Sequence, residues 1–203
     1  ALIELVGKDG TIVVPTFTYT FIKSKIFDVN NSKSEVGNFS EKFRNLYKIK
    51  RSKNPIFSVA AIGRHAKDFA NSSTKSSFGK NSCFGMLKNL SAKIFCIGCS
   101  FNKITYVHHV EENLQVKYRY MKEFDGEILD NDKKILVTNE YYVRDLSFDT
   151  NCNLNKLKKK MIENKEIILG DFGRLRTYLC NSKQFYNACC KILSEDKFGL
   201  INQ

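Results

Sequence analysis

The chain has 203 residues, enough for one sizeable α/β domain or at most two small ones. Its composition is 42% hydrophobic, which supports a buried core, yet no stretch approaches the ~18–20 apolar residues of a membrane span, and the first residues lack the basic start of a secretory signal. The formal net charge of +12 favours anionic partners, and phosphate-bearing small molecules more than nucleic acid, because no arginine-rich arm or zinc-finger spacing is present.

The cysteines indicate a reducing compartment. There are seven, an odd number, and without a secretory signal they predict free thiols and a cytoplasmic location. Cys96 and Cys99 have the C-x-x-C spacing of a metal or redox site, but no second pair follows. Cys96 also alternates with apolar residues in an expected strand, where cysteine behaves as a small hydrophobe. We therefore expect no metal site.

Helices and strands are predicted to alternate through the first half of the chain. The expected elements are a helix ending near residue 7, a strand over 11–15, a helix over 37–47, a strand over 56–63, a helix over 64–70, a helix over 83–90 and a strand over 93–98. Residues 22–37 are polar and are expected to be irregular. The alternating hydroxyl and aromatic residues of 16–21 fit an edge strand as well as a loop that lines a pocket.

Several polar positions in this half have two interpretations. Thr16 is either an ordinary strand threonine or a site residue, and Tyr19 would line the same pocket. Asp28 either contacts a cationic substrate or caps a turn. The Ser/Gly/Asn-rich loop over 71–82 is either a plain surface loop or a source of backbone amides for an anion at the following helix. It contains no nucleotide-binding fingerprint.

The stretch from residue 101 to 113 holds the most informative pair of the sequence. His108 and Glu111 are three residues apart, so a helix here places both on one face. A carboxylate beside an imidazole fixes its tautomer and raises its basicity, as a general base requires. Thr105 lies one turn before His108. The alternative, a surface salt bridge, is common for this spacing, but two of the chain's three histidines gather here after a predicted strand.

The second half is expected to contain a β-rich insert and a C-terminal α/β part. Strands are predicted over 115–120 and 133–143 with a turn at 124–127, followed by a helix over 154–163, short strands over 167–173 and 175–179, and a helix over 182–194. No repeat or linker is present, so one domain over 1–203 is the simplest organisation. The chain starts without Met, and we expect residues to precede Ala1.

Several short motifs, in order, resemble the aminoglycoside 3-N-acetyltransferase family, which is distinct from the GNAT acetyltransferases. They are Gly10–Thr18, Phe27-Asp28, Ser34 with Gly37, Glu41 with Phe43-Arg44, Arg51-Ser52, Pro55, Ser58–Gly63, Phe78-Gly79, Ser82, Phe84-Gly85, and Thr105, His108 and Glu111. The resemblance covers about residues 1–125 and is loose beyond 126.

The resemblance implies a fold, a reaction and residue roles. The fold is an α/β class, three-layer α/β/α sandwich, and the reaction transfers acetyl from acetyl-CoA to a primary amine. It implies His108 as the base, Glu111 as the residue that orients it, and Thr105 as a residue that holds the oxyanion or positions His108. The residues implied to line the CoA channel are Thr16, Arg51, Ser58, Ser82, Phe84 and Gly85, and the candidate substrate-binding residues are Asp28 and Tyr19.

The choice of amine follows from charge. Aminoglycosides are polycations, whereas this chain carries +12, so we expect a nucleotide-linked amino sugar of surface-polysaccharide (O-antigen) synthesis, such as GDP-perosamine. Asn54 and Cys83 depart from the residues usual in the family. The alternatives are an aminoglycoside antibiotic as acceptor and, from another class, a non-catalytic nucleic-acid or anion-binding module. A homo-oligomer is left open.

Overall fold

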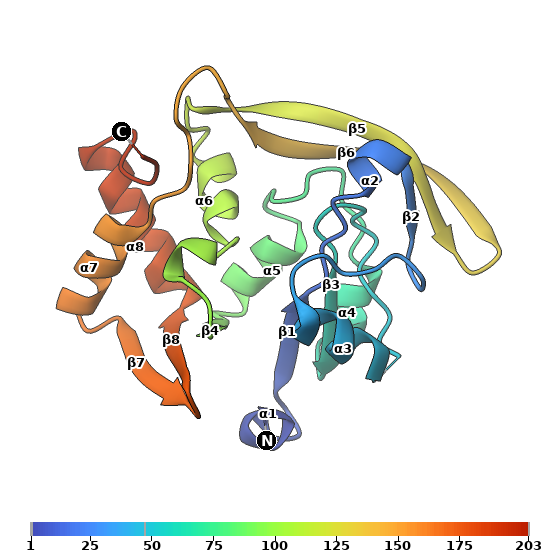
Figure 1. The fold of residues 1–203 in the computed structure, drawn as a ribbon, viewed down its shortest axis with the longest axis horizontal. Coiled ribbons are helices and arrows are strands. Elements are labelled where there is room, and N and C mark those ends of the chain that lie inside the picture. The colour runs from blue at the N-terminus through green and yellow to red at the C-terminus, as the bar shows by residue number, and fades with distance from the viewer. Residues whose placement is uncertain (1, 47, 203) are drawn as a thin grey trace. The chain divides into compact units, whose positions relative to one another are not determined.

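The structure is a computed structural model that describes residues 2–46 and 48–202. The chain divides into two compact units, residues 1–77 with 122–141 and residues 78–121 with 142–203. Each is described by itself. Both contain helices and strands, so the predicted α/β class is confirmed (Figure 1). One domain over 1–203 stays a prediction.

The first unit contains a two-stranded antiparallel sheet. Strand β1 (Thr11–Pro15) pairs with β3 (Val59–Gly63), with Val14 opposite Ala60. Both side chains are buried and pack with Phe43 of helix α3 (Asn38–Leu46). Helices α1 (Leu2–Val6) and α4 (Ala66–Asn71) are also as predicted, while position 47 of the predicted 37–47 helix lies outside the described residues.

Residues 16–20 are a loop rather than an edge strand, and residue 21 begins a helix. The segment predicted to be irregular contains two short elements. The amides of Thr16 and Thr18 donate to the carbonyls of Ser58 and Ile56, which continues the β1–β3 pairing without a regular strand. Helix α2 (Phe21–Ser24) and strand β2 (Ile26–Asp28) follow. Three or four residues give too little periodicity to be predicted from sequence.

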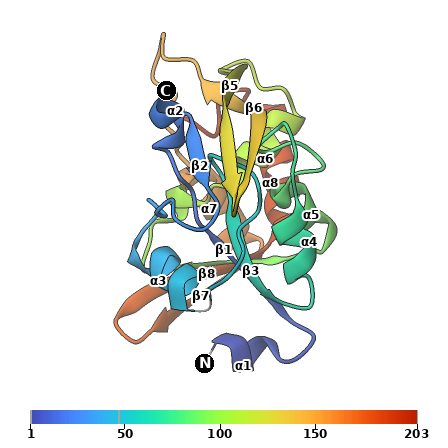
Figure 2. The ribbon, with the colours of Figure 1, turned by 90° about the vertical axis from the view of Figure 1, so that its right-hand side faces the viewer.

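The predicted β-rich insert is a long hairpin. Strand β5 (Arg119–Asp130) and strand β6 (Lys133–Arg144) form a three-stranded sheet with β2 in the order β2-β5-β6, and β2 is parallel to β5. Figure 2 shows β2 alongside the hairpin. The turn predicted at 124–127 is wrong, because Gly126 lies inside β5. A Cβ there would meet the Lys25 carbonyl oxygen at 2.4 Å. The glycine therefore permits the backbone just before β2 to approach β5 closely.

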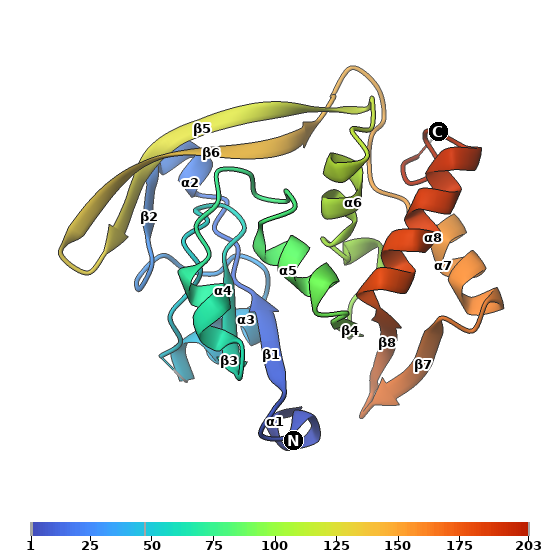
Figure 3. The ribbon, with the colours of Figure 1, turned by 180° about the vertical axis from the view of Figure 1, so that it is seen from behind.

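The second unit is built on a sheet in the order β4-β8-β7. It contains strands β4 (Lys93–Ile97), β7 (Ile167–Phe172) and β8 (Leu175–Asn181) and helices α5 (Cys83–Asn89), α6 (Val107–Asn113), α7 (Asn155–Glu163) and α8 (Ser182–Glu195). Figure 3 shows α7 and α8 beside this sheet. Cys96 is buried, as expected for a strand cysteine that behaves as a small hydrophobe, and Cys180 on the neighbouring strand β8 is buried as well.

Candidate active site

Helix α6 places the predicted pair on one face. A 3₁₀ turn, η1 (Phe101–Lys103), precedes it, so the predicted 101–113 helix is two elements. The amide of His108 donates to the Thr105 carbonyl at 3.0 Å, which starts the first turn. Nδ1 of His108 then meets Oε2 of Glu111 at 2.6 Å. The His108–Glu111 pair predicted from the i, i+3 spacing is therefore formed.

The pair is largely withdrawn from water. The Glu111 side chain is 0% exposed, while that of His108 keeps 17% exposure. The same Oε2 atom of Glu111 lies 2.7 Å from Nε of Arg119, a buried side chain at the start of β5. Nη1 of Arg119 donates to the Tyr142 carbonyl at 3.2 Å. Glu111 thus joins the imidazole to a buried guanidinium through one oxygen.

The electrostatics favour an ionised Glu111 and a neutral His108. Burial by itself would raise the pKa of Glu111, but His108 and Arg119 outweigh it, and the pKa is lowered. Burial lowers the pKa of His108 below its usual 6.5, with Glu111 opposing and Arg119 and Arg144 assisting. Since an ionised carboxylate only accepts hydrogen bonds, Nδ1 carries the proton and Nε2 keeps its lone pair. This is the protonation state of a general base.

The chain also contains the surface version of the same motif. His65 and Asp68 have the identical i, i+3 spacing, and Nδ1 lies 3.0 Å from Oδ2. Their side chains are 35% and 62% exposed. Spacing alone therefore does not distinguish a surface salt bridge from a base with its orienting carboxylate, whereas burial does.

His109 has a different role from His108. It is buried, and its Nδ1 lies 2.7 Å from the Phe78 carbonyl oxygen, to which it donates. Asn113 adds a contact from the next turn of the helix, since its Nδ2 donates to the His109 carbonyl at 2.6 Å. Burial lowers the pKa of His109, so it too is neutral near pH 7. These contacts tie α6 to the segment before α5.

Aromatic side chains before and within α5 pack beside His108. The Phe78 ring meets the imidazole of His108 edge-on, with centroids 5.4 Å apart, and lies 4.6 Å from the Phe84 ring. Ser82 caps α5, accepting from the Gly85 amide at 3.4 Å and donating to the Gly79 carbonyl at 2.7 Å. Three residues predicted to line the CoA channel, Ser82, Phe84 and Gly85, are thus brought near the predicted base through Phe78. Their contact with CoA stays a prediction.

Thr105 occupies the turn before α6, and its side chain is partly exposed. The backbone carbonyl holds His108 as described above. The predicted role of its hydroxyl, as oxyanion donor or as support for His108, stays a prediction.

The other predicted CoA residues form a buried polar cluster in the first unit. Nη2 of Arg51 donates to the Thr16 carbonyl at 2.5 Å, to the Thr18 hydroxyl at 2.6 Å and to the Ser58 hydroxyl at 2.9 Å. Arg51 is fully buried and stacks over the Phe27 ring at 4.7 Å. Burial lowers its pKa to about 10. Thr16, Arg51 and Ser58 therefore bind one another, and their predicted contact with CoA stays a prediction.

The candidate substrate-binding residues have clear local roles. Asp28 caps a turn, because Oδ1 accepts from the amides of Asn30 and Asn31, both at 2.9 Å. Burial by itself would raise the pKa of the Asp28 carboxyl, but the hydrogen bonds from Asn30 and Asn31 outweigh burial, and the pKa is lowered. Tyr19 is partly exposed and packs edge-on against Phe57 with centroids 6.1 Å apart. Substrate contacts of Asp28 and Tyr19 stay predictions.

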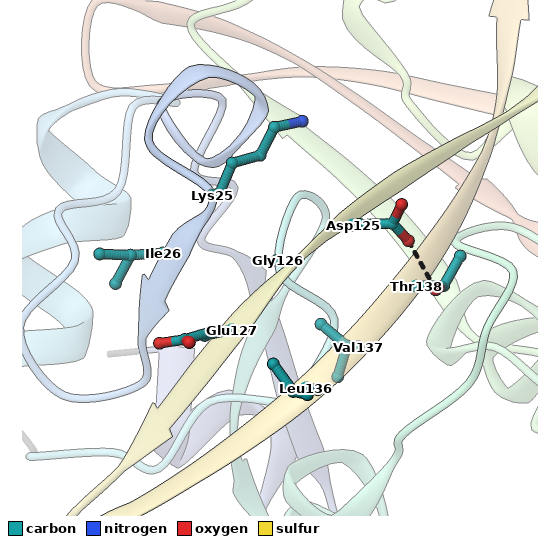
Figure 4. A pocket seen from close by; sticks show the side chains of 8 residues that line it. All are labelled: Lys25, Ile26, Asp125, Gly126, Glu127, Leu136, Val137 and Thr138. Atoms are coloured by element: carbon teal, nitrogen blue, oxygen red, sulfur yellow. Dashed lines mark hydrogen bonds between the residues drawn. The ribbon is translucent and has the colours of Figure 1, made fainter.

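A pocket with other lining residues lies in the first unit. It has a volume of about 750 Å³ and is lined by Lys25, Ile26, Asp125, Gly126, Glu127, Leu136, Val137 and Thr138. Figure 4 shows Thr138 donating to Asp125, at 2.6 Å, on the face of the β5–β6 hairpin. None of the predicted site residues lines it. Its chemistry, two carboxylates beside apolar side chains, differs from that of the His108–Glu111 pair.

Sequence reasoning missed Arg119 and Phe78 as neighbours of His108. Arg119 follows Glu111 by eight residues, beyond the reach of a helical spacing rule, and its sequence neighbours indicated only a strand. One signal was available in the sequence. Arg119 stands among the alternating residues of 115–120, in a predicted strand with one buried face, and an arginine there is expected to be paired if it is buried.

Two negative findings concern the described part of the chain. Among these residues, no group of three or more His, Cys, Asp or Glu side chains is placed to hold a metal ion. No helix within residues 2–46 and 48–202 is both long and apolar enough to span a membrane.

Solved structures similar to this chain include aminoglycoside acetyltransferases and a Bacillus subtilis protein. AAC-IIIb, in a binary complex with CoASH, aligns with 16% identity over 93% of this chain and 79% of its own, with a TM-score of 0.78. YokD from Bacillus subtilis aligns with 18% identity over 96% and 78%, TM-score 0.78. The AAC(3)-IVa apoenzyme aligns with 21% identity over 100% and 75%, TM-score 0.79. The chain thus has the α/β fold that the resemblance implied.

The sequence comparisons identify the family. A comparison with curated proteins gave no match. The family model described as aminoglycoside 3-N-acetyltransferase matches residues 1–194, nearly the whole chain. The match confirms the predicted enzyme class, an acetyl-CoA-dependent N-acetyltransferase, and acetyl-CoA as the co-substrate. With the fold and the buried His108–Glu111 pair in agreement, the chain belongs to the aminoglycoside 3-N-acetyltransferase family.

Proposed function

We propose that this enzyme acetylates a primary amine of an aminoglycoside, with His108 as the general base. The observation that carries the proposal is the buried 2.6 Å contact between Nδ1 of His108 and Glu111, which leaves Nε2 as a neutral base. The acceptor class is supported by the family match and by the ligands of structural neighbours. AAC-VIa binds sisomicin, and AAC(3)-IVa binds gentamicin C1A and apramycin.

The proposed chemistry is a direct transfer. The protonated amine has no lone pair, so Nε2 of His108 first takes one of its protons. The amine nitrogen then forms a bond to the thioester carbonyl carbon of acetyl-CoA, and the carbon–sulfur bond breaks. The nitrogen releases its second proton to solvent as the amide forms. His108 returns a proton to the departing thiolate, which leaves as CoASH. Glu111 stabilises the imidazolium while it exists. Both substrates must be bound together, because no acyl-enzyme is formed.

The comparisons favour the aminoglycoside over the nucleotide-linked amino sugar as the acceptor. The expectation of a nucleotide-linked amino sugar such as GDP-perosamine rested on the net charge of +12. No match to a polysaccharide-biosynthesis enzyme supports it, while the neighbours with bound acceptors contain aminoglycosides. The aminoglycoside is therefore the proposed substrate. The positive charge retains an explanation in the phosphates of CoA.

The remaining site predictions belong to the same proposal. Ser82, Phe84 and Gly85 are proposed to border the pantetheine of CoA, since they lie next to Phe78 and therefore near His108. Thr105 is proposed as a hydroxyl donor to the reacting carbonyl. Thr16, Arg51 and Ser58 are proposed to support the CoA site through the loops that they join. A cytoplasmic location, where acetyl-CoA is available, and a homo-oligomer stay proposals.

The experiment that tests this function is a thiol-release assay. Purified enzyme is given acetyl-CoA with gentamicin, apramycin or sisomicin, with a nucleotide-linked 4-amino sugar, or with no acceptor. We expect CoASH release above the no-acceptor rate with an aminoglycoside, and a product heavier by one acetyl group in the mass spectrum. Turnover with the nucleotide sugar alone would overturn the acceptor assignment. Salt-sensitive binding to DNA without CoASH release would instead favour the non-catalytic module.

A further inference from the structure

One carboxylate oxygen of the site has two positively charged or proton-donating neighbours. Oε2 of Glu111 lies 2.6 Å from Nδ1 of His108 and 2.7 Å from Nε of Arg119. Both side chains beside it are buried or nearly so, with Arg119 1% exposed. Water therefore screens the Arg119 charge little, and its effect on the pair is larger than that of a surface arginine.

Arg119 is itself fixed. Its Nη1 donates to the carbonyl of Tyr142 at 3.2 Å, so β6 holds the guanidinium while Nε faces Glu111. The titratable groups that interact with the pair come from other parts of the second unit. They are Tyr118 just before β5, Arg119 at its start, Tyr142 and Arg144 on β6, Cys152 in the following loop and Cys189 on α8. Arg144 is exposed and donates to Asn151 at 2.5 Å.

We propose that Arg119 is a positioning residue of the acetyl transfer, which shares Oε2 of Glu111 with His108 and so keeps their common proton on Nδ1 of the imidazole. The inference rests on the proposed role of His108 as the base. It assigns Arg119 no contact with substrate.

The charge of Arg119 affects both protonation states of His108. Its positive charge stabilises the Glu111 carboxylate, so the proton of the hydrogen bond stays on nitrogen and Nε2 remains the free base. The same charge opposes the imidazolium that forms when His108 takes the amine proton. The base therefore returns its proton to the leaving thiolate readily. A neutral residue at 119 would strengthen the hold of Glu111 on that imidazolium, and His108 would become protonated at higher pH.

The test is an NMR titration of His108 in ¹⁵N-labelled full-length protein without substrate. We expect the wild-type ring to be in the Nδ1–H tautomer. In Arg119→Gln we expect the pKa of His108 to rise by on the order of one unit, and in Arg119→Lys, which keeps the charge, by less. Arg144→Gln is the matched control, since its exposed charge is screened and should cause a smaller shift than Arg119→Gln. Unfolding midpoints are measured for each variant.

Two results would overturn the inference. The first is a wild-type His108 in the Nε2–H tautomer, which needs no variant to fold. The second is a folded Arg119→Gln with an unchanged His108 titration, which would leave Arg119 a structural ion pair only. The acid limb of kcat/KM against pH is expected to move upward with the titration. If the titration moves but no aminoglycoside is acetylated, the inference about Arg119 stands and the proposed acceptor fails.

Discussion

At the scale of single residues, burial rather than spacing distinguishes His108, the proposed base, from His65. His65-x-x-Asp68 and His108-x-x-Glu111 have the same spacing, but only the second pair excludes water from its carboxylate. The loss of solvent makes the hydrogen bond to Glu111 an effective constraint on the tautomer of His108, whereas an exposed pair contributes little.

The two pairs give a matched test. We expect His108→Ala to lower kcat on the order of 10²–10⁴-fold, as for a lost general base, while binding of CoA is retained. His65→Ala is the control and should leave kcat within about twofold, because surface substitutions rarely affect more. Steady-state kinetics and calorimetric titration with CoA provide the two readouts. Near-normal turnover in His108→Ala would remove this residue from the role of base.

We expect His109 to affect stability rather than proton transfer. The sequence places it about 100° from His108 around the helix, and its Nδ1 donates to the Phe78 carbonyl. We expect His109→Leu to lower the free energy of unfolding by about 1–3 kcal/mol, because the buried carbonyl loses its partner. Urea denaturation measures this loss. A stable His109→Leu with kcat reduced as far as in His108→Ala would contradict this assignment.

At the scale of elements, the entry into α5 depends on a glycine. The Ser82 cap draws the preceding loop over the helix, and a Cβ on Gly85 would lie 1.9 Å from the Lys80 carbonyl oxygen. Backbone cannot yield as a flexible side chain can, so the loop itself would have to move. Because Phe78 in the same segment contacts His108, we expect a change at Gly85 to displace the proposed base without touching it.

Two glycine substitutions separate the effect of the close contact at Gly85 on stability from the general effect of replacing a glycine by alanine. We expect Gly85→Ala to destabilise the protein by about 2 kcal/mol or more, since overpacking against backbone is costly. Gly170→Ala in β7 is the control, because its Cβ would meet only the Thr177 hydroxyl, at 3.3 Å. Its stability should change by less than about 1 kcal/mol. Thermal melting of both variants measures the two effects. An unchanged melting midpoint for Gly85→Ala would contradict the close approach of Gly85 to the Lys80 carbonyl.

At the scale of the whole molecule, the buried His109 and the largely buried His108 make stability depend on pH. Burial lowers the pKa of His108 and of His109 relative to the unfolded chain. Below the ordinary histidine pKa of 6.5, the unfolded chain therefore binds more protons than the folded protein. Acidification through this range destabilises the fold, and the contribution is fully present only at higher pH.

We accordingly expect a lower free energy of unfolding at pH 5.5 than at pH 7.5, measured with urea. The difference should shrink in His108→Ala, which removes one of the two groups. Equal or greater stability at pH 5.5 would contradict the lowered pKa values. Acetylation should also decline on the acidic side, because a protonated His108 cannot accept the amine proton.

The α/β class, most of the elements and the pairing of His108 with Glu111 could be predicted from the sequence. Each depends on local periodicity or on spacing within one helix turn, which residues near in sequence are sufficient to set. The family resemblance over residues 1–125 was also present in the order of its motifs, and the family match extends it to residues 1–194.

Other features became visible only in the folded protein. They are the burial of one histidine pair and not the other, the position of Arg119 at the Glu111 carboxylate, and the binding of Arg51 to Thr16, Thr18 and Ser58. A continuous strand also replaces the expected turn at Gly126. These features join residues distant along the chain, or residues on different elements. Desolvation and ion pairing at such places depend on which side chains the completed fold brings together, and no local pattern contains that information.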